Sequence, residues 1–124
     1  MSRYQDLDAW KKAMDLAERI HKVTKSFPKN EQYGLVSQVR ESSASIPANI
    51  AEGYGRWTRP DTRQYLFRAR GSLFETETWL QLSERFGYLR KEEAATLLTH
   101  CAGVAAPLNG LIRYFNSEID KKRR

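Results

Sequence analysis

One segment of this chain combines the spacing of a buried helix face with side chains that such a face usually lacks. Between residues 35 and 53, six residues recur at alternating steps of four and three, the spacing of a helical seam packed against other helices. They are Leu35, Val39, Ser42, Ile46, Asn49 and Gly53. Half of these residues are small or polar, so burial of apolar surface alone cannot hold the seam. It requires close backbone approach at the small residues and hydrogen-bond partners for the polar ones.

The same helical period recurs in three more segments. Their seam residues are Trp10, Ala13, Ala17, Ile20, Thr24 and Phe27, then Leu66, Ala69, Leu73, Thr76, Leu80 and Ser83, then Ala94, Leu98, Cys101, Ala105, Leu108, Ile112 and Phe115. The four seams predict helices over about residues 8–27, 31–55, 60–86 and 90–119, with residues 121–124 as a frayed basic tail. The connections are too short for crossovers, so consecutive helices must run in opposite directions. We therefore expect one all-α domain, residues 1–124, folded as an up-down-up-down antiparallel four-helix bundle.

Several residues mark the expected helix ends. Asp6 or Asp8 is expected to cap the first helix, and Asn30 the second. Pro60 suits the first turn of the third helix, and Gly87 is its expected stop.

Two prolines fall inside predicted helices, Pro47 in the second and Pro107 in the fourth. A proline there removes a backbone hydrogen bond and costs about 3 kcal/mol. Residues 42–45 include three serines whose hydroxyls could satisfy the freed carbonyls, and we expect a bent second helix.

Composition and the N-terminal sequence indicate the cellular compartment and the kind of partner that we expect. The chain of 124 residues has a net charge of +6, a pI near 9.6 and one cysteine, Cys101. A single cysteine excludes an internal disulfide framework and fits a reducing compartment. The N-terminal MSRYQDLDAW lacks the apolar core of a signal peptide, and no apolar stretch approaches the roughly 20 residues that span a bilayer. We expect a cytoplasmic protein with no membrane contact and an acidic partner.

Four stretches carry a resemblance to a known family: DLDAWKKAMDLA, FPKNEQYGLVSQVRESSASIPANIAEGYGR, GSLFETETWL and RFGYL. Over about residues 4–115 the chain resembles the 23S ribosomal RNA intervening-sequence protein family of small four-helix bundles. The resemblance implies a left-handed bundle that assembles as a homo-oligomer, with pentamers the form known in relatives. One branch of the family consists of accessory proteins of diversity-generating retroelements, which bind nucleic acid and partner a reverse transcriptase. It implies no catalytic residue and no cofactor.

The family motif falls on polar residues of the second and third helices, which we interpret as a structural network. Its expected members are Ser42, Ser45, Asn49, Glu52, Ser72, Glu75 and Glu77. Folding the two helices back at residue 57 or 58 places Glu52 near Arg63 and Asn49 near Leu66, and brings residues 42–45 level with Gly71 and Ser72. Such a network would fix the register of the two helices. The alternative is a functional carboxylate site.

Catalytic chemistry has little support in the sequence. Four-helix bundles hold di-iron centres with a Glu-x-x-His on each of two helices. Glu18 and His21 provide one such pair, but Leu97 stands three residues before His100, so we expect no metal centre. Cys101 lies in an apolar seam with no base nearby and is interpreted as a core thiol.

The predicted topology places the charge unevenly. Residues 1–17, 43–73 and 105–124 meet at one end, with 13 Lys and Arg against 7 Asp and Glu, whereas the opposite end holds 8 of each. We call the first the basic end. Its candidate nucleic-acid-binding residues are Lys11, Lys12, Arg56, Arg59, Arg63, Arg113, Lys121, Lys122, Arg123 and Arg124, close to Tyr54, Trp57 and Tyr65. Cations interleaved with aromatic rings suit phosphate contacts and base stacking. The alternative is a solubilising surface.

Further apolar residues flank the seams of the first and fourth helices: Leu16, Val23, Leu97, Val104 and Leu111. They indicate either a wide core face or a surface for a neighbouring subunit.

Our leading hypothesis is a non-enzymatic homo-oligomer that binds RNA or DNA through its basic end and could assist a nucleic-acid enzyme. The alternatives are a protein–protein scaffold without nucleic-acid binding and a metal-dependent enzyme.

Overall fold

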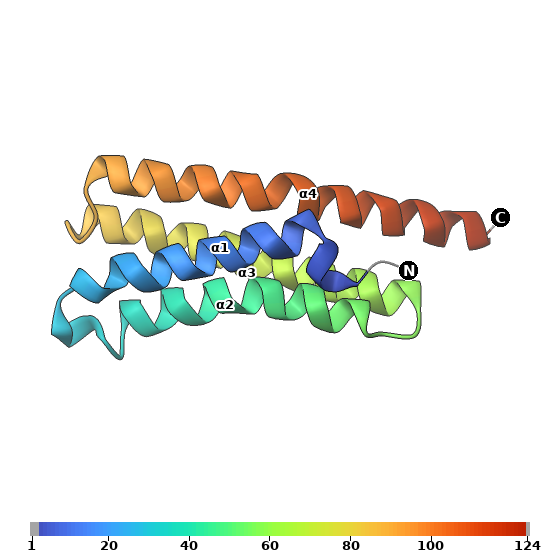
Figure 1. Ribbon diagram of the computed structural model, residues 1–124, viewed down its shortest axis with the longest axis horizontal. Helices are drawn as coiled ribbons and strands as arrows, with labels where there is room; N and C mark the ends of the chain where they lie inside the picture. Colours follow the sequence, from blue (N-terminus) through green and yellow to red (C-terminus); the bar gives the residue numbers. More distant parts are fainter. Residues whose placement is uncertain (1–2, 124) are drawn as a thin grey trace.

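Four long helices account for most of the chain. The computed structural model describes residues 3–123. Its helices are α1 (Asp8–Val23), α2 (Leu35–Tyr54), α3 (Arg59–Arg85) and α4 (Lys91–Arg123), with short 3-10 turns η1 (Tyr4–Asp6), η2 (Thr24–Ser26) and η3 (Lys29–Glu31). Consecutive helices run in opposite directions and pack side by side, and α4 closes the bundle against α1 (Figure 1). The expected all-α, antiparallel four-helix bundle is confirmed.

The helices differ in length, and this difference shapes the basic end. α1 has 16 residues and α4 has 33, which correspond to about 24 Å and 50 Å. The C-terminal turns of α4 extend past the other helices (Figure 1).

The predicted frayed tail is wrong for residues 121–123, because they are helical, and Arg124 lies outside the described residues. Cations at a helix C-terminus interact favourably with its dipole, and Lys121 also pairs with Glu118 at 3.6 Å.

Two of the predicted helix caps are wrong, and one of these helices begins later than expected. α1 has Leu7 at its N-cap and no side-chain cap, so neither Asp6 nor Asp8 fills that role; Asp8 is the first helical residue. α2 begins at Leu35, four residues later than expected, because Asn30 belongs to η3 and Gly34 occupies the N-cap. The Leu35 amide instead donates to Glu31 Oε1 at 3.4 Å.

The ends of α3 agree with the sequence. Thr58 is the N-cap, and its hydroxyl accepts a hydrogen bond from the Asp61 amide at 3.3 Å, with Pro60 in the first turn. At the other end Gly87 has a φ of +81°, a left-handed conformation that favours glycine and ends the helix.

Both helical prolines lie inside continuous helices, Pro47 in α2 and Pro107 in α4. The expected compensation is wrong in detail. Pro47 deprives the Ser43 carbonyl of its helical donor, but the hydroxyls of Ser42 and Ser43 donate one turn earlier, to the carbonyls of Val39 (3.3 Å) and Arg40 (3.2 Å).

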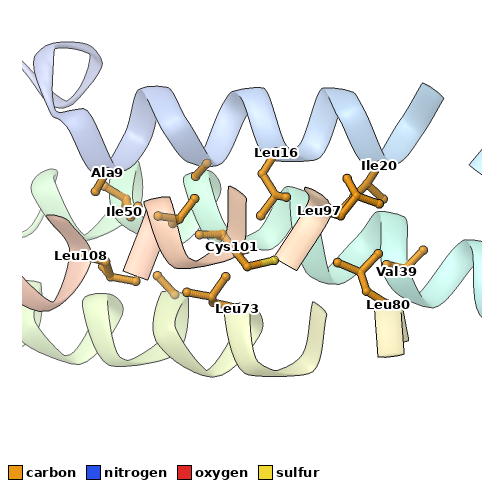
Figure 2. Close-up of a cluster of buried hydrophobic side chains, with 14 of the residues drawn as sticks. Ala9, Leu16, Ile20, Val39, Ile50, Leu73, Leu80, Leu97, Cys101 and Leu108 are labelled. Atoms are coloured by element: carbon orange, nitrogen blue, oxygen red, sulfur yellow. The ribbon is translucent and has the colours of Figure 1, made fainter. Parts of the chain in front are cut away.

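The core is formed by the inward seams of all four helices (Figure 2). Its largest fully buried side chains include Leu16, Ile20, Ile46, Ile50, Leu66, Leu73, Leu80 and Leu108. Leu97 and Val104 are also buried, whereas Val23 and Leu111 are partly buried against the core. The residues that flank the seams of α1 and α4 therefore widen the core face, and they do not form a separate surface for a second subunit.

Among the described residues one helix, α4, is long and apolar enough to cross a membrane by length and composition. Residues 94–112 contain no Lys, Arg, Asp or Glu, so the expectation that no apolar stretch approaches this length was wrong. One face of this stretch is accounted for within the bundle, because Leu97, Cys101 and Leu108 are buried in the core.

The predicted polar network joins α2 to α3 through hydroxyl groups. Ser42 and Thr76 share a hydrogen bond of 2.9 Å, and Ser45 and Ser72 share one of 2.8 Å. The Asn49 amide donates to the carbonyl and the hydroxyl of Ser45 at 2.8 and 2.9 Å. Because Ser45 accepts from Asn49, its own proton is free to reach Ser72. This confirms that residues 42–45 lie level with Ser72 and gives each polar seam residue a partner.

Gly53 marks a close approach of the two helices. A Cβ atom at this position would lie 2.8 Å from the Cβ of Tyr65 and 3.2 Å from the carbonyl oxygen of Thr62. The Thr62 hydroxyl donates to the Gly53 carbonyl at 2.8 Å, which joins α3 to the last turn of α2. The seam therefore has the close backbone contact that its small residues predicted.

Candidate nucleic-acid interface

The basic end contains a cavity of about 830 Å³. It is lined by the connection between α2 and α3 and by the C-terminal part of α4, the helix that continues past the start of α1 in Figure 1. Leu7, just before α1, lines it together with Leu111, Phe115 and Ile119 of α4. The continuation of α4 past the start of α1 thus gives the cavity an apolar floor beside the α2–α3 connection. In this floor Phe115 and Ile119 are buried and Leu111 is partly buried.

Aromatic rings line the same cavity. Tyr54 and Tyr114 both pack edge-on against Phe115, with ring centroids 5.9 and 5.2 Å apart. Burial, and then the nearby Tyr114, raise the pKa of the Tyr54 hydroxyl, so this group stays a neutral hydrogen-bond donor at neutral pH. Trp57, in the connection between α2 and α3, is 100% exposed. A fully exposed indole contributes no packing to the single chain and is available for stacking.

Cations surround the cavity, and within residues 3–123 no carboxylate lines it. Arg56, Arg59, Lys122 and Arg123 are among its lining residues. Within residues 3–123, the ion pairs at this end are Arg56 with Glu52 at 3.1 Å and Lys121 with Glu118 at 3.6 Å. The other three lining cations have no carboxylate partner among the described residues. The cavity therefore suits an anionic ligand with flat or apolar groups.

A row of arginines and aromatic rings continues from the cavity along α3. The guanidinium groups of Arg56 and Arg68 each lie 4.5 Å from the ring centre of Tyr65. Arg56 also donates a hydrogen bond to the Tyr65 hydroxyl. These contacts leave both arginines charged while fixing their direction.

Two other arginines of α3, Arg63 and Arg70, bond to side chains of α4. Arg63 and Arg70 flank the ring of Phe67 at 5.7 and 5.2 Å. They donate to the side-chain oxygens of Asn116 (2.9 Å) and Asn109 (3.4 Å). Glu52 and Arg63, expected to be neighbours, thus take different partners, since Glu52 pairs with Arg56, two residues after the end of α2.

The structure brings together only part of the predicted set. Arg56, Arg59, Lys122 and Arg123 line the cavity, and Arg63 follows on α3. The remaining candidates are exposed on other surfaces, Lys11 and Lys12 on α1 and Arg113 and Lys121 on α4, and Arg124 lies outside the described residues. Sequence reasoning missed the apolar floor. The signal was the period of α4, which continues through Ile119 past the length of its partner α1.

The predicted carboxylates do not form a site. Glu52 and Glu75 are exposed, and neither is hydrogen-bonded into the serine network among the described residues. Glu77 is half-buried, and burial raises the pKa of its carboxyl group. A hollow of about 100 Å³ beside Ser42 and Ser45 is lined by Glu75. Within residues 3–123, no three His, Cys, Asp or Glu residues are grouped closely enough to hold a metal ion.

Cys101 provides a test of the core, because burial, followed by the nearby Glu77, raises the pKa of its thiol to about 12. At pH 8 the reactive thiolate is then about a thousandfold rarer than for an ordinary thiol. We expect a disulfide reagent such as DTNB to label native Cys101 at least about 100-fold more slowly than the protein in guanidinium. Labelling at equal rates would contradict the buried position of this residue.

The comparisons with known proteins agree with this architecture. A crystal structure of a protein with unknown function from the S23 ribosomal protein family of Bacteroides thetaiotaomicron VPI-5482 superposes with a TM-score of 0.73. The two chains are 28% identical, and the alignment covers 84% of this chain and 97% of the other. No protein with a curated description is similar to this chain. Residues 5–110 match the family model of the 23S rRNA-intervening sequence protein, and the chain therefore belongs to this family.

Proposed function

We propose that this protein binds RNA or DNA through its basic end and acts without catalysing a reaction. The observation that carries the proposal is the cavity beside Trp57. It combines four cations with several aromatic rings, and no carboxylate of the described residues lines it. Phosphate groups supply the negative charge that these cations lack, and exposed rings supply stacking surfaces for bases. The uneven distribution of the net charge supports the same conclusion.

We further propose that the protein assembles as a homo-oligomer, with the pentamer implied by the family resemblance. The outward face of α4 between residues 94 and 112 is uncharged, with Ala95, Ala102 and Ala106 exposed. On the adjacent α3, Phe74 is 57% exposed. A second copy would bury this surface and multiply the charge of the basic end. Light scattering of the purified protein tests this proposal, and a mass near 14.4 kDa would contradict it.

The salt dependence of binding tests the main proposal. If four to six cations contact phosphates, log K falls with log salt concentration with a slope of about −3 to −4 for a single strand. We therefore expect the affinity for a fluorescein-labelled 20-nucleotide DNA or RNA to fall about 100-fold between 50 and 200 mM NaCl. Fluorescence anisotropy measures this directly. If no binding is detected, or if the affinity does not change with salt concentration, the proposal is overturned.

A protein–protein scaffold is the second candidate, and the apolar floor of the cavity favours it. Leu111, Phe115 and Ile119 could accept apolar side chains of a partner. A protein that stays bound to this chain after nuclease treatment and at 0.5 M salt, and is released when Leu111 is changed to Asp, would support the scaffold.

A further inference from the structure

We propose that the cavity at the basic end accepts an unpaired nucleobase, so that the ligand is single-stranded nucleic acid and not a duplex. This inference rests on the proposed function and deepens it. The volume of about 830 Å³ falls within the range of pockets that enclose small ligands. Bases in a duplex are stacked and paired, so only a base that has left the stack can enter a cavity bounded by helices.

The chemistry of the lining fits a base. The walls provide aromatic faces and edges from Tyr54, Tyr114 and Phe115, and Trp57 stands exposed at the mouth. Within residues 3–123, the hydroxyls of Tyr54 and Tyr114 have no protein hydrogen-bond partner and can reach polar atoms of a base edge. Rings that stack and hydroxyls that hydrogen-bond are the groups by which proteins hold splayed-out bases.

The charges indicate where the backbone of the strand runs. Arg59, Arg63 and Arg70 lie on one side of α3, and the first and last are separated by 11 residues, about 16 Å along the helix. This row begins at the cavity and leads away from it, with Arg63 and Arg70 held by Asn116 and Asn109. A base in the cavity thus places successive phosphates along a row of arginines.

The test compares three ligands at the same salt concentration. A 20-nucleotide single strand, its blunt duplex and an acidic peptide with alternating Glu and Phe are measured by anisotropy against the full chain. We expect the single strand to bind at least about tenfold more tightly than the duplex. We also expect Trp57→Ala to weaken single-strand binding by about tenfold and duplex binding by less than twofold, since stacking contributes only where a base is free.

Two controls keep the result interpretable. Tyr33 is 89% exposed at the opposite end, so Tyr33→Ala removes an equally accessible ring away from the cavity and leaves all affinities unchanged. A strand carrying one 5-iodouracil should photo-cross-link to Tyr54, Trp57 or Tyr114.

Three outcomes would contradict one or both proposals. Equal, salt-sensitive binding of strand and duplex, with cross-links elsewhere, would overturn the base pocket but not nucleic-acid binding. No binding of either would overturn both, and peptide binding that depends on Trp57 would assign the cavity to a protein partner.

Discussion

Changing Arg56, Arg59 and Arg63 together to Glu is expected to weaken nucleic-acid binding at least about 100-fold at 100 mM NaCl. Each cation removed takes away one phosphate contact, and each carboxylate introduced repels the backbone. The salt slope should also become shallower by about 2 to 3, because fewer counterions are released on binding. Anisotropy titrations of the unmodified protein and the variant, at four salt concentrations, measure both quantities.

The matched control carries the same change in net charge at the opposite end. Lys25, Lys29 and Lys91 are exposed there, in or beside η2, η3 and the start of α4. Changing them to Glu should alter the affinity less than about fivefold, because the Debye length at this salt concentration is about 10 Å. Equal losses in the two triple variants would show that net charge alone drives binding, and would contradict an interface at the basic end.

A second charge variant separates binding from folding. Arg56 pairs with Glu52 and Arg63 bonds to Asn116, so their replacement also removes contacts within the bundle. The side chains of Arg59 and Lys122 make no hydrogen bond or ion pair with another described residue. Changing these two residues to Glu should therefore weaken binding at least tenfold while the melting temperature stays within a few degrees.

The helices and their buried faces could be predicted because each follows from a long, repeated pattern. The seams of α2 and α3 contain enough residues for the period to dominate local exceptions, including Pro47. The serine contacts were predictable for the same reason. Two antiparallel helices joined by a short connection bring residues equidistant from it to the same level. This placed residues 42–45 level with Gly71 and Ser72, and the structure adds that Ser45 and Ser72 are bonded.

Features that depend on one side chain or on the ends of helices could not be predicted. The hairpin register puts Glu52 and Arg63 at one level, but it does not say which way a long side chain turns. Arg56, four residues later in the connection that follows α2, competes successfully for Glu52. Similarly, the late start of α2 follows from η3 and Gly34. They form a local turn that cannot be recognised from helical periodicity.

The cavity was missed in the sequence for a different reason. It arises from a difference between α1 and α4, which are separated by most of the chain. The apolar period of α4 through Phe115 and Ile119 is typical of an ordinary core face until the short reach of α1 is known. The flanking residues Leu16 and Val104 had the opposite outcome. They widen the apolar stripes of α1 and α4, and both are buried because the other helices of the bundle surround them.

Gly53→Ala is expected to destabilise the protein by about 2 kcal/mol, the cost of adding a methyl group where two backbones meet. The new Cβ would lie 2.8 Å from the Cβ of Tyr65 and 3.2 Å from the Thr62 carbonyl, and neither atom can rotate away. α2 and α3 must therefore separate, which also strains the hydrogen bond from Thr62 to the Gly53 carbonyl. For 124 residues, this loss corresponds to a melting temperature lower by about 8 °C, measured by circular dichroism.

Gly71 supplies the matched comparison because it lies inside α3, where an added methyl group would meet no other atom within 4 Å. Gly71→Ala should leave the fold intact and raise the stability by up to about 1 kcal/mol, since alanine is the better helix former. The same substitution is thus expected to have opposite signs at two glycines of one helical hairpin. If both variants were stabilised, helix propensity would outweigh packing at Gly53, and α2 and α3 would not be held together by close backbone contact.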